Sequence, residues 1–159
     1  MQAVGSGRSP TDQGHAEFAG GAGIAFGHGH RAVLMAGTDE AHAGGVDVGL
    51  FPAMVHLDEV TRATAGSHVK VGGQNCSDEQ EGAFTGEVSA AMLRDLHVSY
   101  VILGHSERRS LFGEDDAFIN RKVNAALAAS LKPILCVGEL LSEREAGTTN
   151  AVVKRQLEL

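Results

Sequence analysis

The stretch Val98-Ser-Tyr-Val-Ile-Leu-Gly-His-Ser-Glu-Arg-Arg-Ser-Leu-Phe-Gly-Glu114 indicates the fold of the chain. Its apolar run, Tyr100 to Leu103, is typical of a strand that is buried on both faces of a parallel sheet. Gly104 ends the run, because glycine lets the backbone turn sharply. His105 and two further polar residues then follow at the carboxyl end of the strand, which is where α/β folds place their chemistry.

Strands and helices are expected to alternate on both sides of this stretch. Apolar runs predict strands over residues 46–51, 68–71, 100–103 and 134–137. Apolar residues at helical spacing predict helices over 54–64 and 89–96, after Asp115, and over 149–159. This alternation calls for parallel strands joined by right-handed crossovers, and so for either a doubly wound sheet or a (β/α) barrel. Neither G-x-G-x-x-G after the first strand nor G-x-x-x-x-G-K-[ST] is present, which disfavours the common nucleotide-binding folds.

Capping residues indicate where three of the helices begin. Ser89 and Asp115 each precede a segment with helical periodicity and are predicted N-caps. Ser142 and Glu145 have the spacing of a capping box. The helix after Asp115 is predicted to bury a stripe of five apolar residues: Phe118, Ile119, Val123, Ala126 and Leu127.

The composition is that of one globular domain preceded by an unusual segment. The chain has 159 residues, of which 43% are hydrophobic and 21% charged, and this is enough for one ordinary domain with a core. Eleven of the 21 glycines lie in residues 1–45, where we find no helical or strand period apart from a candidate strand at 32–36. We therefore expect an irregular, glycine-rich segment over 1–45 and a folded domain over 46–159.

The net charge argues against two classes of partner, and the cysteine content indicates a cellular compartment. The net charge of -7 argues against a surface for nucleic acid or anionic membrane, since both attract clustered Lys and Arg. No apolar run approaches the ~20 residues of a membrane-spanning helix. Cys76 and Cys136 occur without a Cys-x-x-Cys motif or an apolar signal segment, which favours a reduced, cytoplasmic compartment.

Four histidines in the first segment suggest a metal site, with His28 and His30 as the sharpest pair. The other two are His15 and His42. Their neighbours are mostly glycines, which would not hold ligands in a fixed geometry, and no carboxylate or thiolate lies at a metal-site spacing. We expect a solvated segment and no bound metal.

Four motifs, in this order, resemble the triosephosphate isomerase family: residues 82–87 (GAFTGE), 100–109 (YVILGHSERR), 111–114 (LFGE) and 131–139 (LKPILCVGE). The resemblance covers about residues 46–157. It implies a partial (β/α)₈ TIM barrel that contains units two to five of the family's eight. It also implies a homodimer that interconverts dihydroxyacetone phosphate and glyceraldehyde 3-phosphate in glycolysis and gluconeogenesis. The substrate would be a small phosphorylated triose, and no cofactor would be needed.

The resemblance gives His105 the role of the electrophile, which polarises the substrate carbonyl and moves a proton between the two enediolate oxygens. In the family, for which this mechanism is known, a helix N-terminus keeps the histidine neutral. Residues from Ser106 onward can form such a helical turn in this chain. Glu107 is similar to an acidic residue that pairs with a lysine from the first strand and supports catalysis. Arg108 and Glu114 resemble residues that brace the barrel and its dimer contact.

The resemblance implies supporting roles for two further residues. Thr85 lies on what resembles the long third loop, which reaches into the active site of the partner subunit. Cys136 resembles a cysteine at a strand end that supports packing near the site. A nucleophilic role for Cys136 is disfavoured, because no histidine neighbours it in the sequence and the family forms no covalent intermediate.

The sequence also departs from the family pattern. The nearest counterpart of the family's Asn-x-Lys motif is AGTDE at 36–40, which puts Thr38 and Glu40 where Asn and Lys are expected. Only four strand-helix units, the second to the fifth of the family, are matched, so the glutamate base, the lid and the phosphate-binding loops of the last three units are missing from the match. We therefore expect an isomerase chain with little or no activity by itself. The alternative is a non-catalytic half-barrel module that pairs its exposed sheet edges with another chain.

Overall fold

The computed structural model describes residues 24–25 and 48–158. In this part of the chain all strands are parallel and form one sheet: β1 (Ile24–Ala25), β2 (Gly49–Leu50), β3 (Lys70–Gly73), β4 (Tyr100–Leu103) and β5 (Lys132–Leu135). Helices follow the strands from β2 onward: η1 (Met54–His56), α2 (Leu57–Ala63), α3 (Ala90–Asp95), α4 (Ser106–Leu111), α5 (Asp116–Ala128), α6 (Leu141–Glu145) and α7 (Thr149–Leu157). None of the helices in the described part of the chain is long and apolar enough to cross a membrane.

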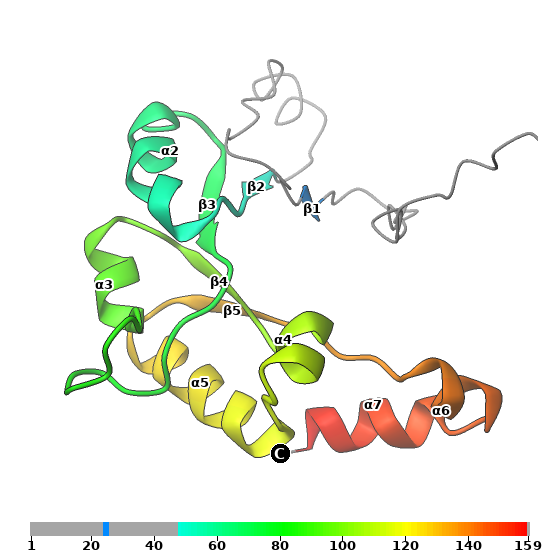
Figure 1. The fold of residues 1–159 in the computed structure, drawn as a ribbon. Coiled ribbons are helices and arrows are strands. Elements are labelled where there is room, and N and C mark those ends of the chain that lie inside the picture. The colour runs from blue at the N-terminus through cyan, green and yellow to red at the C-terminus, as the bar shows by residue number, and fades with distance from the viewer. Residues whose placement is uncertain (1–23, 26–47, 159) are drawn as a thin grey trace, which may run out of the picture.

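The order of the strands decides between the two architectures that the alternation allows. The spatial order β1-β2-β3-β4-β5 is the order along the chain. A doubly wound sheet reverses its strand order at a switch point, whereas a (β/α) barrel adds each strand beside the previous one. Figure 1 shows α2, α3 and α5 along one side of these strands. The structure therefore supports the predicted partial (β/α)₈ barrel.

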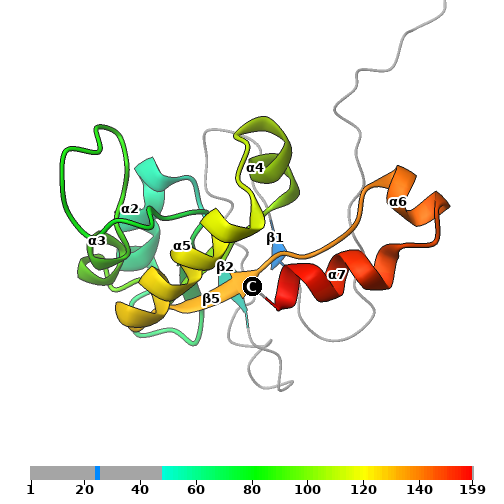
Figure 2. The ribbon, with the colours of Figure 1, turned by 90° about the horizontal axis from the view of Figure 1, so that it is seen from below.

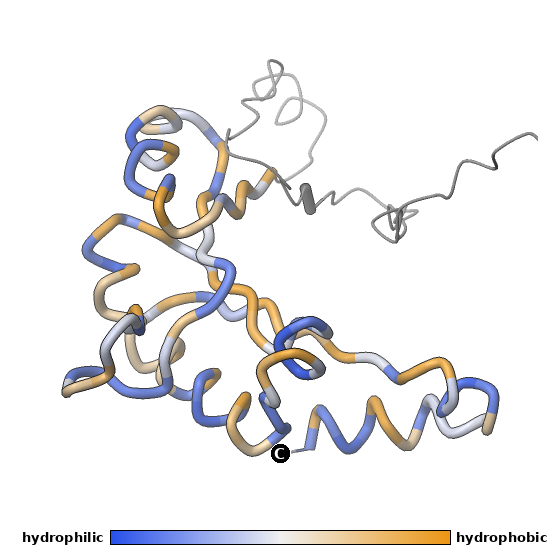
Figure 3. The backbone as a smooth tube through the Cα atoms, in the orientation of Figure 1, coloured by the Kyte–Doolittle hydropathy of each residue, from blue (hydrophilic) through white to orange (hydrophobic). Residues whose placement is uncertain are grey.

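The core lies between the strands and the helices that cover them. It contains Leu57 and Val60 of α2, Leu93 of α3, and Val101 and Leu103 of β4, all of which are buried. Hydrophobic positions are concentrated in β4 and β5, while hydrophilic and hydrophobic positions alternate along α7 (Figure 3). This pattern agrees with α7, which buries Val152 and exposes most of its other residues.

Strand β3 begins and ends two residues later than predicted, and its last two residues are glycines, which an apolar pattern does not include. The prediction placed it at 68–71, whereas the strand is Lys70–Gly73, and Gly72 and Gly73 pair with Tyr100 and Val101 of β4. A Cβ atom at Gly72 would lie only 2.0 Å from the Phe51 ring. Glycine is therefore required there by a side chain 21 positions earlier in the chain. A periodic pattern of neighbouring residues cannot predict such a contact.

Strand β5 differs from its prediction in the opposite direction. It spans Lys132–Leu135 and not 134–137, because its register pairs Lys132 with Tyr100 and Leu135 with Leu103. Val137 lies beyond the strand and is 38% exposed. Strand β2 was predicted over 46–51 and consists of Gly49–Leu50, although residues 46 and 47 lie outside the described part.

The two N-caps are confirmed, but the capping box is wrong. The Ser89 hydroxyl accepts a hydrogen bond from the Met92 N–H, and the Asp115 carboxylate accepts one from the Phe118 N–H. Ser142 lies inside α6, because this helix begins at Leu141. The Glu143 carboxylate accepts the bond from the Leu140 N–H at 2.8 Å, and this is the contact that was predicted of Glu145.

The buried face of α5 is not the five-residue stripe that was predicted. Ile119 and Ala126 are buried, and Val123 is partly buried, but Leu127 is 56% exposed. Lys122 occupies the buried position between Ile119 and Ala126. Leu127 is one residue past Ala126, which turns it about 100° around the helix and away from the sheet.

The first segment is described only at Ile24–Ala25. These two residues form β1, which pairs in parallel with β2. No period in the sequence predicts this strand within residues 1–45. The candidate strand at 32–36 and the four histidines of the metal hypothesis lie outside the described residues.

Candidate active site

The candidate site is built where β4 passes into α4. Gly104 follows the last residue of β4 and has a φ of +73°. This left-handed conformation is open to glycine and costly for other residues. His105 is therefore directed to the carboxyl end of the sheet, where it serves as the N-cap of α4. The predicted turn at Gly104 and the predicted place of His105 are both present.

The contacts of the His105 ring indicate where its proton lies. Its Nδ1 accepts a hydrogen bond from the Glu107 backbone N–H, with an N···N distance of 3.3 Å. The Glu107 carboxylate lies 3.6 Å from the same nitrogen and would require Nδ1 to carry a proton. A backbone N–H can only donate, and it is held by the helix, so we assign a bare Nδ1 and a protonated Nε2. The imidazole is neutral in this arrangement, and 31% of the side chain is exposed.

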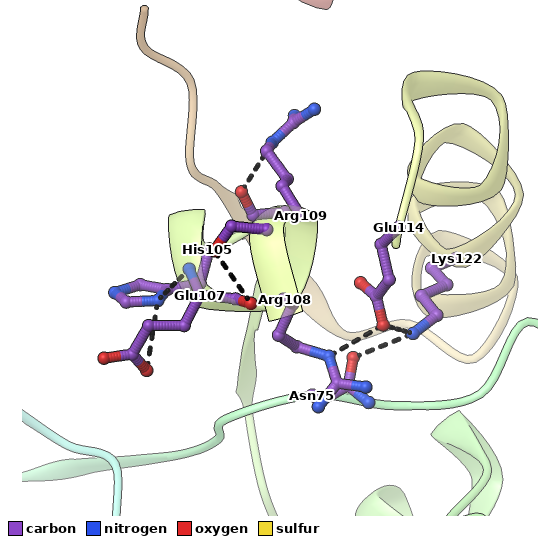
Figure 4. Close-up of polar contacts among 9 residues, drawn as sticks. Asn75, His105, Glu107, Arg108, Arg109, Glu114 and Lys122 are labelled. Carbon is purple, nitrogen blue, oxygen red and sulfur yellow. Dashed lines mark hydrogen bonds and ion pairs between the residues drawn. The ribbon is translucent and has the colours of Figure 1, made fainter. Parts of the chain in front are cut away.

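Ser106 and Glu107 are the first two residues of α4, and both are exposed. Among the described residues, the Glu107 carboxylate contacts the His105 ring (Figure 4). The pairing of Glu107 with a first-strand lysine is not seen in this part of the chain and stays a prediction. Ser106 supplies the first turn of the helix that His105 caps, as the sequence predicted.

Arg108 and Glu114 lie together, and they belong to a larger buried network. The Glu114 Oε1 atom accepts from Arg108 Nε at 2.7 Å and from Lys122 Nζ at 2.5 Å. Lys122 Nζ also donates to Asn75 Oδ1 at 3.1 Å. The Glu114 and Lys122 side chains are 1% and 2% exposed. This network joins the loop after β3, α4 and α5 (Figure 4). The role of Arg108 and Glu114 in bracing the barrel and its dimer contact stays a prediction.

Sequence reasoning missed Asn75 and Lys122. A signal for Lys122 was present, because it stands three residues after Ile119 and four before Ala126, on the buried face of α5. A lysine at such a position needs a buried acid, and Glu114 is close in the chain. Asn75 is 47 positions from Lys122, and nothing local indicates that the two side chains meet.

Arg109 belongs to the motif at 100–109, from which no role was predicted for it, and it contacts several groups near His105. Its Nε donates to the Gly104 carbonyl oxygen at 2.8 Å, and its Nη2 lies 3.4 Å from the Cys136 carbonyl oxygen. Its Nη1 forms an ion pair of 2.5 Å with Asp116, which also accepts from Arg155 Nε at 3.3 Å. Partial burial raises the pKa of Asp116, but the bonds and charges of Arg109 and Arg155 outweigh it and leave the pKa below its ordinary value.

The two cysteines are free thiols. Cys136 directly follows β5, and its N–H donates to the Leu103 carbonyl oxygen at 2.8 Å. Burial raises the pKa of its thiol, and the nearby Arg109 charge opposes this rise only in part. Cys76 is 1% exposed, and burial raises its pKa to about 11. Neither thiol is activated as a nucleophile. Cys136 joins β4 to β5 next to the site, and its supporting role in packing there stays a prediction.

Thr85 is not brought to His105 within this chain. It lies in the loop between β3 and α3, where residues 79–87 are all exposed. Figures 1 and 2 show this loop projecting away from α4. Its role at the site of a second subunit stays a prediction, and it concerns a loop that is exposed in the described part of the chain.

The described residues contain no group of three or more His, Cys, Asp or Glu side chains that could hold a metal ion. The chemistry at the end of β4 is instead that of a neutral imidazole. Its Nε2–H is a hydrogen-bond donor, and α4 and the Arg109 contacts fix the backbone that carries it. Such a donor can polarise a carbonyl oxygen without a change of charge on the protein.

Comparison with known proteins agrees with this site. The family model for triosephosphate isomerase matches residues 27–159, a match that begins ahead of Val46. The chain is 57% identical over 113 residues to the triosephosphate isomerase of Carboxydothermus hydrogenoformans, which is 71% of this chain and 45% of that protein. It is 54% identical over 114 residues to the enzyme of Thiobacillus denitrificans, which is 72% of this chain and 46% of that protein. The chain spans about half the length of these curated relatives, and it belongs to the triosephosphate isomerase family.

Proposed function

We propose that this chain contributes the electrophilic histidine to the interconversion of dihydroxyacetone phosphate and glyceraldehyde 3-phosphate, a step of glycolysis and gluconeogenesis. The observation that carries the proposal is the hydrogen bond from the Glu107 N–H to His105 Nδ1. This bond leaves the proton on Nε2, so the neutral ring is a donor towards a substrate at the carboxyl end of β4. The named relatives support the reaction.

In this proposal His105 Nε2–H donates a hydrogen bond to the substrate carbonyl oxygen. As a base removes the proton from the neighbouring carbon, negative charge develops on that oxygen, and the hydrogen bond strengthens. His105 then moves a proton between the two oxygens of the enediolate. In the family the base is a glutamate that follows a later strand, and no glutamate in residues 46–157 corresponds to it by resemblance. The reaction moves only protons, so the proposal includes no cofactor.

The proposal includes a second copy of the chain as partner, because the family is homodimeric. The exposed loop at 79–87 supports this, since it carries Thr85 and projects Phe84, which is 47% exposed. An exposed phenylalanine on a projecting loop is suited to burial against another surface. Light scattering coupled to size-exclusion chromatography tests this part of the proposal, with Phe84→Ser as the variant expected to favour the monomer.

We also propose that the protein acts in the cytoplasm. Both cysteines are free, which is typical of proteins in a reducing compartment.

A chimera tests the catalytic role of His105. In the chimera, the 113-residue segment of this chain that matches the Carboxydothermus hydrogenoformans enzyme would replace the matching segment of that enzyme. The rest of that enzyme would then surround His105. In this chimera His105→Gln keeps a donor of similar reach but cannot shuttle a proton. We expect kcat to fall by roughly 10² or more with a modest change in KM, because the interaction is made chiefly in the transition state.

The matched control is His97→Gln. His97 is exposed and precedes β4, so the same chemical change is made at the opposite end of the same strand. We expect its kcat to stay within about twofold of the parent, since surface substitutions are usually close to neutral. A chimera that is active but indifferent to His105→Gln would show that His105 is structural, and would favour the non-catalytic half-barrel module.

A further inference from the structure

Arg109 contacts three segments of the chain near the end of β4. The Gly104 carbonyl belongs to the turn, the Cys136 carbonyl to the end of β5, and Asp116 to the first turn of α5. Arg109 itself lies in α4, and its side chain is 20% exposed. Three different kinds of segment therefore share one guanidinium, whose planar array of donors can serve several acceptors at fixed angles.

The peptide that Arg109 holds is the one that leads into His105. Arg109 Nε donates to the Gly104 carbonyl oxygen at 2.8 Å. Because a peptide group is planar, fixing the direction of this carbonyl also fixes the His105 N–H and the direction of its Cα. On the other side, the His105 carbonyl oxygen accepts from the backbone N–H groups of Arg108 and Arg109, at 2.9 and 3.0 Å. Both peptide groups of His105 are thus held by α4.

The packing around Gly104 shows how closely the guanidinium approaches. A Cβ atom at Gly104 would lie 3.1 Å from Arg109 Nη2, 3.1 Å from the Cys136 carbonyl oxygen and 3.3 Å from Ile119 Cγ2. The positive φ therefore favours glycine, and an added Cβ atom would also press on the guanidinium and on the Cys136 carbonyl oxygen. The turn and Arg109 are matched to one another.

Arg108 and Arg109 are adjacent in sequence but point in opposite directions from α4 (Figure 4). Arg108 reaches Glu114, whereas Arg109 reaches the backbone beside His105. Asp116 orients the Arg109 guanidinium through an ion pair of 2.5 Å, and its own side chain is 16% exposed. Charge-assisted hydrogen bonds in such partly buried surroundings are stronger and better defined in geometry than neutral ones.

We propose that Arg109 is a positioning residue for His105. Its guanidinium holds the Gly104–His105 peptide against the end of β5 and the start of α5, and this orients the imidazole so that Nδ1 accepts from the Glu107 N–H and the proton lies on Nε2. The catalytic value of this orientation rests on the proposed function. The orientation itself is a property of the chain that can be measured without any turnover.

The first experiment measures the tautomer of His105 in the 159-residue chain, with ¹⁵N-labelled histidine and NMR at a pH well above the imidazole titration. The parent chain should show a bare Nδ1 and a protonated Nε2. Arg109→Met removes every donor, and the two nitrogen shifts should move towards the average of both tautomers. Arg155→Met is the control, since it removes the exposed second partner of Asp116 and leaves the Arg109 contacts in place. It should give the parent spectrum.

Arg109→Lys covers the outcome in which Arg109→Met does not fold. Lysine keeps the charge opposite Asp116 but is a point donor, so it cannot hold both carbonyl oxygens and the carboxylate at fixed angles. Its histidine shifts should lie between those of the parent and the averaged tautomers. Parent-like shifts in whichever Arg109 variants fold, or an equal change in Arg155→Met, would overturn the proposal.

The second experiment uses kinetics in the chimera and separates this proposal from the proposed function. Arg109→Met should lower kcat by about 10- to 100-fold with little change in KM, because a misplaced catalytic group affects the chemical step. If His105→Gln is silent while the tautomer still responds to Arg109, the proposed function fails and the positioning role stands. If His105→Gln lowers kcat but neither readout responds to Arg109, only the positioning role is overturned.

Discussion

The buried pair of Glu114 and Lys122 should respond to mutation in a way that a double-mutant cycle can resolve. Glu114→Leu removes the only acid that contacts Lys122 among the described residues. It leaves the ammonium, 2% exposed, with the Asn75 amide oxygen and the face of the Phe118 ring as its remaining partners. Removing one member of a buried ion pair typically costs about 3–5 kcal/mol, because the other charge stays buried without compensation. We expect a loss of that size in the free energy of unfolding.

The reverse substitution should cost less. In Lys122→Met, Glu114 keeps its 2.7 Å bond to Arg108, whose side chain is 26% exposed. One charged hydrogen bond is lost, which corresponds to about 1.5–3 kcal/mol. In the double variant Glu114→Leu/Lys122→Met no buried charge is left unpaired. It should therefore be more stable than Glu114→Leu alone, because well-packed apolar replacements of a buried pair are often neutral.

Urea unfolding of the 159-residue chain, followed by circular dichroism, gives the four free energies of the cycle. If Glu114→Leu no longer unfolds cooperatively, a cooperative unfolding transition in the double variant would itself show that the unpaired charge of Lys122 caused the loss. Lys154→Met with Glu158→Leu is the matched control, since this pair is 3.5 Å apart and 71% and 64% exposed. Its coupling should be below about 1 kcal/mol. A double variant no more stable than Glu114→Leu would refute the reasoning.

Three further predictions concern Gly104, the Asp116 ion pair and the two cysteines. Gly104→Ala should destabilise the chain by at least about 1–2 kcal/mol, measured as a shift in the urea midpoint, because φ is +73° there. Asp116 has a lowered pKa, so its ion pair with Arg109 should stabilise the chain above about pH 4 and lose this effect as the carboxylate is protonated. The stability difference between the parent and Asp116→Asn should therefore shrink as the pH falls through the folded-state pKa, and a difference that does not change with pH would contradict this. Iodoacetamide should label Cys136 well before Cys76 in mass spectra of the native chain, since Cys76 is buried and its thiol has a pKa of about 11.

Local signals in the sequence predicted the centre of the molecule correctly. The bounds of β4 agree with the apolar run at Tyr100–Leu103, and Ser89 and Asp115 make the expected capping bonds. The turn at Gly104 places His105 at the carboxyl end of the strand, as its position after the apolar run indicated. These features depend on residues that are neighbours in the chain, so a pattern of a few positions is sufficient to specify them.

The tertiary structure decided everything that depends on residues far apart in the chain. Glycine at 72 is required by the Phe51 ring, and β3 ends two residues later than its apolar pattern because Gly72 and Gly73 pair with β4. Lys122 is buried because Asn75, 47 positions away, and Glu114 surround its ammonium. Arg109 meets the Cys136 carbonyl oxygen, 27 positions away, only because β5 pairs beside β4. The identity of a side chain shows that it needs partners, but only the packing of strands and helices determines which partners come within reach.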